Sequence, residues 1–354
     1  MPADAIRLEQ LPRPAHPVGE VLFITNMWPD DERPYYGSFI HSQAVSLARA
    51  DVAVDVLYLR GYLGPQVYAR AMAVAPRVAR RRPYDIVHVH YGHTGAACLG
   101  VTRRPLVLSF CGADVIGMQR EYGITVKSRV EADVFRWLGL AASATITKSA
   151  EMERALPRML RARNHILSNG VDLEAFAPRP RSAARAALGW EQQGKVMLFL
   201  GNPDDPRKNV DLARRAAALV AERVPGARLH EAWAIAPTDV PTYLSAADCL
   251  VFPSRGEGSP NAVKEAMACE LPIVATPVGD VPERLAGVEH CWVRDPTPEA
   301  FADALVLALA ADRAPAARRA VESLGLQRVA RQLMGIYDQA LAARGAATAK
   351  FAAA

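Results

Sequence analysis

Two acidic residues and a short glycine-rich loop near residue 260 form the most distinctive group of reactive side chains in the sequence. Residues 252–268 have the pattern of a strand, a glycine-rich loop and a helix, with Ser259 as the helix N-cap and Pro260 at the first helical position. The backbone N–H groups of Asn261 and Ala262 would then be free, and together with the positive end of the helix dipole they would form an anion site. The spacing therefore predicts a place for a diphosphate.

Glu257 and Glu265 stand on either side of this predicted anion site. Glu265 lies about 7.5 Å along the helix axis from Pro260, so its carboxylate can accept hydrogen bonds from a ribose while phosphates stay at the helix tip. Glu257 lies in the loop, where it is free to face a sugar on the other side of the phosphates. A capped surface helix would show the same spacing, so a second signal is needed.

A pair of cations supplies that second signal. Arg207 and Lys208 lie in segment 201–209, directly after a predicted strand and at the start of a predicted helix. A cation in this place can neutralise the charge that develops on a departing diphosphate. Most isolated Arg-Lys pairs are simply solvated, so the pair gains its weight from its position beside the first motif.

The elements that must position these residues alternate between short apolar runs and Ala-, Arg- and Glu-rich helical stretches. This pattern is typical of an α/β fold with helices on both faces of parallel sheets. The predicted strands are 18–25, 52–59, 85–91, 105–110, 144–148, 166–169, 195–201, 227–233, 249–254, 272–276 and 291–294. The predicted helices are 38–49, 67–82, 298–310 and 327–342.

The alternation breaks at 177–188, where prolines and arginines cluster. We therefore predict two Rossmann-like, doubly wound domains that face a cleft. Their bounds are 1–175 for the first domain, 176–194 for a linker, 195–325 for the second domain, 326–345 for a terminal helix and 346–354 for a disordered tail. Ligands of such sheets bind beyond the carboxyl ends of the strands.

Composition narrows the classes of function. The chain has 354 residues, of which 51% are hydrophobic and 22% charged, so it is globular, and its net charge of +5 favours anionic partners without naming one. Five cysteines without a C-x-x-C pair argue against a disulfide framework and a zinc knuckle, and they indicate a reducing compartment. The proline-rich, acidic start lacks the apolar core of a signal peptide, and no uncharged stretch is long enough to span a bilayer. We expect a cytoplasmic protein without a nucleic-acid partner.

Three histidines, His88, His90 and His93, could suggest a metal site. His88 and His90 would share one face of a strand, but no Asp, Glu or Cys lies between His88 and His93, and strand histidines more often satisfy local hydrogen bonds. The chain also lacks an Asp-x-Asp triplet, a common clamp for a metal and a diphosphate. We therefore expect neither a metal nor a bound cofactor.

A basic segment is the one sign of a membrane. Residues 56–84 contain six arginines and no acidic residue. If 66–82 is a helix, it carries one apolar stripe beside these arginines: Val67, Ala71, Val74 and Val78. Two interpretations stay open, because the stripe can pack on its own domain or face anionic lipid at the inner surface of the membrane.

Taken together, these segments resemble glycosyltransferase family 4, whose members are retaining enzymes of the GT-B fold. Glu257, Glu265 and the following EAMACELPIVATPVGDVPE resemble the E-x7-E block of the family, and MWPDDERPYYGSF, DIVHVHYGHTG, SNGVDLEAF and LGNPDDPRKN occur in the family's order. The resemblance implies two GT-B domains with the terminal helix packing back on the first. It also implies metal-independent transfer of a sugar from a nucleoside diphosphate donor, held by the second domain, to an acceptor held by the first.

By position in the family's pattern, the catalytic residues would be Glu257, at the donor sugar, and Lys208, at the diphosphate. The donor-binding residues would be Gly37, Arg207, Gly258, Ser259, Pro260, Asn261, Ala262 and Glu265, with Glu265 at the ribose. The candidates on the acceptor or sugar side are His90, His93, Cys111 and Asp114.

Two positions depart from the family's pattern. Asn202 stands where an arginine is usual, so one diphosphate cation is absent or replaced by Arg207, and Cys111 stands where a histidine is usual, a loss for which His90 or His93 could compensate. These departures keep two alternatives open: a non-catalytic subunit that binds a sugar nucleotide, and a sugar-nucleotide epimerase. The preferred hypothesis is transfer to a hydroxyl acceptor, lipid-linked or part of a surface polysaccharide, in cell-envelope synthesis.

Overall fold

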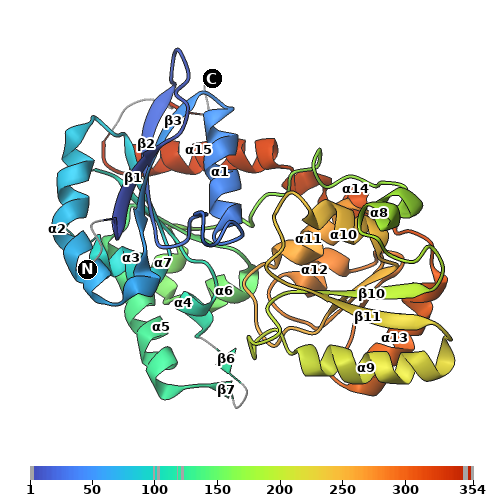
Figure 1. Ribbon diagram of the computed structural model, residues 1–354. Coiled ribbons are helices and arrows are strands. Elements are labelled where there is room, and N and C mark those ends of the chain that lie inside the picture. The colour runs from blue at the N-terminus through green and yellow to red at the C-terminus, as the bar shows by residue number, and fades with distance from the viewer. Residues whose placement is uncertain are drawn as a thin grey trace.

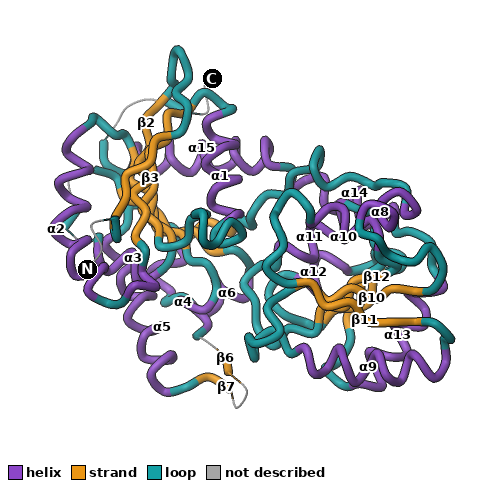
Figure 2. Tube along the Cα trace, in the orientation of Figure 1, coloured by secondary structure: helices purple, strands orange, loops and turns teal. Residues whose placement is uncertain are grey.

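The computed structural model describes residues 4–98, 100–101, 104–117, 119–120, 123–345 and 350–351. It contains two α/β units side by side, each built on its own sheet (Figure 1). The strands lie in the middle of each unit, with helices around them (Figure 2). The predicted fold class, two Rossmann-like domains, is confirmed.

The sheet of the first domain has the strand order β1-β3-β2-β4-β5-β8-β9. Neighbouring strands pair in parallel, except that β1 runs antiparallel to β3 at the edge. The strands are β1 (Ile6–Gln10), β2 (Gly19–Thr25), β3 (Val52–Leu59), β4 (Ile86–His90), β5 (Leu106–Ser109), β8 (Ala144–Thr147) and β9 (Asn164–Ile166). The inner strands are almost wholly buried, which explains their continuous apolar sequences.

Helices cover both faces of this sheet (Figure 1). One face packs against α1 (Ser38–Ala48) and α15 (Leu326–Ala342), and the other packs against α2 (Gln66–Arg81), α3 (Gly92–Ala97) and α5 (Val126–Leu138). The shorter elements are η1 (Gly61–Leu63), α4 (Ala113–Ile116), β6 (Gln119–Arg120), β7 (Gly123–Ile124), η2 (Gly139–Ala141), α6 (Ala150–Ala155) and α7 (Arg158–Arg161).

The second domain has a parallel sheet of order β11-β10-β12-β13-β14. The strands are β10 (Lys195–Leu200), β11 (Ala227–Ala232), β12 (Cys249–Phe252), β13 (Ile273–Ala275) and β14 (Cys291–Val293). One face packs on α9 (Val210–Arg223) and α13 (Pro298–Ala310), and the other packs on α10 (Val240–Ala246), α11 (Asn261–Ala268), α12 (Val281–Leu285) and α14 (Pro315–Val321). The remaining elements are α8 (Arg181–Ala187) and η3 (Glu322–Leu324).

The last helix returns to the first domain, as predicted. Leu333 and Tyr337 of α15 lie in one buried cluster with Phe23 of β2. The ring of Phe351 is fully buried with its centroid 5.3 Å from that of Tyr337, and the ammonium of Lys350 lies 2.7 Å from Asp85. The predicted disorder of segment 346–354 is therefore wrong at Lys350 and Phe351, and its other residues lie outside the described part of the chain.

Two other expectations need correction. The last strand of the first sheet is β9 and not 166–169, because after Leu167, which still donates to the carbonyl oxygen of Thr147 at 2.8 Å, Ser168 and Asn169 contact the second domain. The predicted linker contains α8, where Arg185 is buried 2.6 Å from Asp248, so this segment packs on the second domain. Of the two interpretations of the apolar stripe of α2, the structure supports packing inside its own domain, where Val67, Ala71 and Val78 are buried.

Candidate active site between the two domains

Helix α11 begins one residue later than the sequence suggested. Pro260 is the N-cap and Asn261 the first helical residue, while the hydroxyl of Ser259 makes no cap and instead donates to Asp280 at 2.9 Å. The same hydroxyl accepts a hydrogen bond from the buried ammonium of Lys264 at 3.0 Å. The prediction that Ser259 caps the helix was wrong because these two buried charges hold its side chain. The N–H groups of Asn261 and Ala262 have no acceptor among the described residues.

An ion pair stands in front of this helix. The ammonium of Lys208 lies 2.7 Å from Oε1 of Glu257, and the hydroxyl of Ser254 lies 3.3 Å from the same oxygen. Lys208 follows β10 and Glu257 follows β12, so neighbouring parallel strands bring them to one edge of the sheet. Both side chains are mostly buried, at 25% and 16% exposure, which strengthens their interaction over that of a surface pair.

Arg207, the second predicted cation, pairs with Asp205 at 2.6 Å. It lines a small recess with Glu257 and Gly258 of the second domain and with Cys111 of the first. Its guanidinium is therefore at the meeting point of the two domains, but an internal carboxylate already balances its charge.

The loop that carries Gly258 presses directly on the first domain. A Cβ atom on Gly258 would lie 2.9 Å from the sulfur of Met152 and 3.2 Å from the carbonyl oxygen of Cys111. On its other side, the backbone of this loop packs on Gly279, which has a φ of +59°. An added methyl at Gly258 would have to push aside the end of the Met152 side chain, whereas one on Gly279 would overlap the backbone of the loop, so glycine is required at Gly279.

Glu265 lines a cavity of about 230 Å³ between the domains. Asn261 also lines it from α11, while Tyr35 and Ser38 contribute from the first domain and Ile235 from the second. Burial raises the pKa of Glu265 to about 7, and the nearby Lys264 opposes that rise. A carboxylate in a pocket of this size beside a free helix N-terminus suits the hydroxyls of a nucleoside.

The loop between β2 and α1 brings the first domain to this cavity. Gly37 has a φ of +71°, and a Cβ there would overlap the backbone of Met27. Tyr35 from this loop contacts Trp233 of the second domain, with ring centroids 4.9 Å apart. The domains therefore make two contacts, one at Gly258 beside Glu257 and one at Tyr35 beside the cavity that Glu265 lines.

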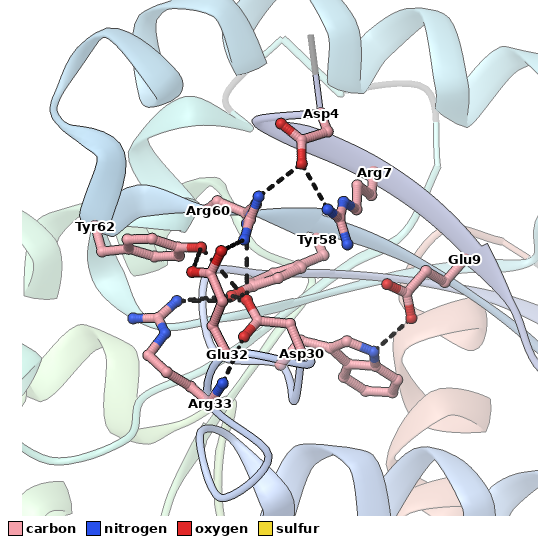
Figure 3. Close-up of polar contacts among 10 residues, drawn as sticks. Asp4, Arg7, Glu9, Asp30, Glu32, Arg33, Tyr58, Arg60 and Tyr62 are labelled. Carbon is pink, nitrogen blue, oxygen red and sulfur yellow. Dashed lines mark hydrogen bonds and ion pairs between the residues drawn. The ribbon is translucent and has the colours of Figure 1, made fainter. Parts of the chain in front are cut away.

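A polar cluster fixes the start of that loop (Figure 3). Asp30 accepts a hydrogen bond from Tyr58 at 3.1 Å and lies 3.6 and 3.7 Å from the guanidinium groups of Arg33 and Arg60. Arg33 also stacks on the ring of Tyr62, 3.4 Å from its centroid. These contacts hold the loop in the conformation that presents Gly37 to the cleft.

The four candidates on the first domain have different environments. His90 is buried, its Nε2 lies 3.0 Å from the amide oxygen of Gln43, and burial holds its pKa well below the usual value. The ring of His93 stacks with that of Tyr91, with a centroid distance of 5.5 Å and an angle of 10° between the ring planes. Cys111 lines the recess described above, and burial raises the pKa of its thiol.

Asp114 is buried and accepts hydrogen bonds from three backbone N–H groups, those of Gly92, Cys111 and Gly112, at 2.8–3.2 Å. Burial raises its pKa to about 6 despite these bonds. Its role here is to hold the turn after β5, so its expected contact with sugar or acceptor finds no support in this geometry.

Several residues at the cleft were not expected from the sequence. Asp280 joins the domains, because its carboxylate lies 3.1 Å from Ser168 and 3.0 Å from Nε of Arg284. Lys264 donates to the carbonyl oxygen of Asn169 at 3.0 Å, and burial lowers its pKa to about 8. Lys148, also buried, follows β8. The only signal in the sequence for these residues is that they follow predicted strands, whose carboxyl ends face the cleft.

Comparison with known proteins agrees with this geometry. Residues 18–175 match the model of Glycosyltransferase Family 4, and residues 231–311 match that of Glycosyl transferases group 1. The chain is a family 4 glycosyltransferase.

Curated relatives of this family 4 glycosyltransferase include D-inositol 3-phosphate glycosyltransferases. That of Mycolicibacterium gilvum is 29% identical over 273 residues, which cover 68% of this chain and 62% of the relative. That of Saccharomonospora viridis is 29% identical over 342 residues, or 81% of this chain and 78% of the relative. The chain thus spans less than two thirds of the first of these relatives.

Solved structures with the same fold include sucrose-phosphate synthase from Thermosynechococcus elongatus, with a TM-score of 0.77, 17% identity, and coverage of 92% of this chain and all of that one. Anabaena HepE in complex with UDP and glucose has a TM-score of 0.64 at 16% identity, with coverage of 90% and 98%. These similarities establish a GT-B arrangement for the glycosyltransferase.

The described residues show neither a metal-binding cluster nor a membrane-spanning helix. No three or more His, Cys, Asp or Glu side chains gather there in a way that could hold a metal ion. Among the same residues, no helix has the length and apolarity needed to cross a membrane.

Proposed function

We propose that this glycosyltransferase moves a sugar from a nucleoside diphosphate donor to a hydroxyl acceptor with retention of anomeric configuration. The observation that carries the proposal is the Lys208–Glu257 ion pair in front of the free N-terminus of α11, facing the first domain. The nucleoside would lie beside Glu265, the diphosphate between the helix tip and Lys208, and the sugar next to Glu257. HepE, which was solved with UDP and glucose, makes UDP-sugars the first donors to test.

The chemistry assigned to these residues is substitution at the anomeric carbon. The bond from that carbon to the phosphate oxygen breaks, the acceptor oxygen bonds to the same face, and the leaving diphosphate takes the acceptor proton. Lys208 and the N–H groups of α11 stabilise the charge left on the diphosphate. Contact between the domains at Gly258 excludes water, which would otherwise compete with the acceptor.

The proposal is tested by the products. The protein is incubated with UDP-, GDP- and ADP-sugars, first alone and then with hydroxyl acceptors that include inositol phosphates, because the curated relatives are named for D-inositol 3-phosphate. Acceptor-dependent release of nucleoside diphosphate with an α-configured product is expected from an α-linked donor. Isomerised donor without acceptor would indicate an epimerase instead, and tight nucleotide binding without any product would indicate a non-catalytic subunit.

We also propose that the first domain contacts an anionic membrane, and that α5 rather than α2 makes the contact. The outward face of α5 is apolar, with Val126, Val130, Val134 and Trp137 exposed by 81%, 56%, 51% and 52%. These positions lie opposite the buried residues of the helix, where a globular protein normally places charged side chains.

Charge favours an anionic bilayer as the partner of this face. Lys127 on α5 is 86% exposed, and the arginine-rich α2 lies on the same face of the sheet, with α3 between the two helices (Figure 1). Exposed apolar side chains beside cations are the combination that binds the surface of anionic lipid. A lipid-linked acceptor would then reach the cleft from this side.

Vesicle sedimentation tests the membrane contact. The protein should sediment with vesicles of phosphatidylglycerol and phosphatidylcholine and not with phosphatidylcholine alone. The double variant V130E/V134E should lose most of this binding. L307E changes an equally exposed leucine on α13 of the second domain and should keep it. Equal binding by both variants would show that α5 does not face the membrane.

A further inference from the structure

Lys148 is a buried cation without a partner. It directly follows β8, at the end of the sheet that faces the cleft, and only 2% of its surface is exposed. Its carbonyl oxygen lies 2.9 Å from the hydroxyl of Ser168, but its ammonium has neither a hydrogen-bond acceptor nor an ion pair among the described residues. The nitrogen is not among the fully enclosed atoms that lack a partner, so the ammonium keeps a narrow contact with solvent. An ammonium with so little water around it and no anion beside it is costly, so such a group is rarely retained for stability.

The other cations at the cleft are balanced inside the protein. Lys208 has Glu257 at 2.7 Å, Arg284 has Asp280 at 3.0 Å, and Lys264 donates to two oxygen atoms. The carboxylate of Asp114 interacts with Lys148 electrostatically, but the two groups form no ion pair. Asp114 instead accepts hydrogen bonds from three backbone N–H groups.

A second unpartnered group lies beside the first. His90 ends β4, which is next to β5 in the sheet and one strand further from β8, and it is 1% exposed. Its Nε2 is satisfied by Gln43, but its Nδ1 is buried without a partner in the described part of the chain. The charge of Lys148 is felt at His90, so the two groups share one region of the cleft floor.

This region also faces the second domain. Lys148 interacts electrostatically with Lys264, which holds Ser259 at the start of α11. Met152, one helical turn beyond Lys148, contacts Gly258. The unpaired ammonium therefore lies on the first-domain side of the loop that precedes the proposed diphosphate site, while in the second domain Asn202 stands where the family usually has an arginine.

We propose that Lys148 binds a phosphate oxyanion of the substrate from the first-domain side of the cleft. Because Nε2–H of His90 donates to Gln43, Nδ1 of His90 is an acceptor and is left to receive a hydrogen bond from a substrate hydroxyl, not to bind the oxyanion. The inference rests on the proposed sugar transfer, whose donor brings two phosphoryl groups. Because the lysine belongs to the opposite domain from Lys208, one anion would hold the two domains together during the reaction. The oxyanion can come from the donor's diphosphate or from a phosphate on the acceptor, and the experiment separates these sources.

The test uses K148M, which removes the charge and keeps a side chain of similar length, with K195M at the start of β10 as the matched control. Calorimetry compares UDP, GDP and ADP with their nucleosides on all three proteins. If the donor's diphosphate supplies the oxyanion, K148M should weaken nucleoside diphosphate binding by about tenfold or more and leave nucleoside binding unchanged. K195M should resemble the parent protein in both measurements.

The melting temperature of the ligand-free proteins separates binding from a structural role. Since the ammonium has no internal partner, K148M should melt at or above the temperature of the parent. A clear fall in melting temperature would mean that Lys148 supports the fold, and it would overturn the proposal.

Inorganic phosphate tests whether the oxyanion comes from a phosphate group on the acceptor. If K148M binds nucleoside diphosphates normally, phosphate should still raise the melting temperature of the nucleotide-loaded parent and not of nucleotide-loaded K148M. If the parent binds no nucleotide, the proposed transfer fails, and the same comparison without nucleotide still tests the oxyanion site. Equal responses of K148M and the parent to every one of these ligands would overturn the inference.

Discussion

On the second-domain wall of the cleft, Lys208 lies 2.7 Å from Glu257 and Arg207 lies 2.6 Å from Asp205, whereas on the first-domain wall Lys148 and Nδ1 of His90 have no partner among the described residues. The first arrangement keeps its shape without a ligand, because each charge is balanced locally. The second is satisfied only when something binds. The comparison suggests a preformed donor wall and a first-domain wall whose charge is completed by substrate.

Removing a charge from the preformed wall should have the largest effect. We expect K208A to lower turnover by about 100-fold or more, because it removes the cation from the leaving diphosphate and leaves Glu257 unpaired. Steady-state kinetics with the cognate donor measure this effect. K195A, which changes a cation 3.8 Å from Asp248 at the far end of β10, should stay near the parent rate. Parent-level activity in K208A would remove the charge-stabilising role.

The next largest effect tests whether Glu257 serves the sugar. E257Q keeps the size and removes the charge, so we expect kcat/KM to fall by about 10- to 100-fold while the Kd for nucleoside diphosphate changes little. Kinetics and calorimetry on the same preparation give both quantities. If binding and transfer fall together, Glu257 contributes to the diphosphate site instead.

A pH dependence should follow from Glu265. Its pKa of about 7 in the folded protein means that the group is ionised above that pH and protonated below it. Because the carboxylate is the better acceptor for ribose hydroxyls, affinity for nucleoside diphosphate should fall by about tenfold from about pH 8 to pH 6. E265Q should bind more weakly at pH 8 and lack this dependence, and an unchanged pH profile in E265Q would contradict the assignment.

The same shift has a consequence for stability. The folded-state pKa of Glu265 lies above its ordinary value of 4.5, so the fold gains by binding a proton, and its stability falls as the pH rises from about 4.5 through 7. At pH 8, E265Q should therefore have a free energy of unfolding about 1–3 kcal/mol higher than that of the parent. Denaturant titration of both proteins measures this difference. Near pH 4.5 the two proteins should be similar.

The smallest effect concerns the contact between the walls. G258A places a methyl group 2.9 Å from the sulfur of Met152 and 3.2 Å from the carbonyl oxygen of Cys111, so the walls must separate slightly. We expect transfer to fall by about three- to tenfold. Nucleotide binding, measured in parallel, should be retained. G335A on α15, where an added methyl meets nothing within 4 Å, is the control.

The sequence predicted the second-domain wall better than the first. Glu257, Arg207 and Lys208 lie in the loops that follow β12 and β10, and Glu265 lies in the helix that follows β12. The apolar runs of those strands are easy to recognise in the sequence because helices bury both faces of the sheet. Edge strand β1 was not predicted because it is partly exposed and therefore lacks a continuous apolar sequence; Leu8, for example, is 37% exposed.

What the sequence could not predict depends on contacts between distant segments. Ser168 and Asp280 are 112 positions apart, and no local spacing links them. Ser259 was assigned as a cap because local rules ignore Asp280 and Lys264, which capture its hydroxyl. Lys148 looked like an ordinary strand-end lysine until its burial and missing partner were known.

The return of α15 to the first domain bears on the order in which the protein assembles. Tyr337 lies 2.7 Å from the buried Nδ1 of His88, and Phe351 packs beside Gly19, so residues from the last part of the sequence complete a core begun by the first part. The sheet of the second domain is formed by strands between Lys195 and Val293 and needs no such late segment. During synthesis on the ribosome, the domain that emerges first is therefore the one that finishes folding last.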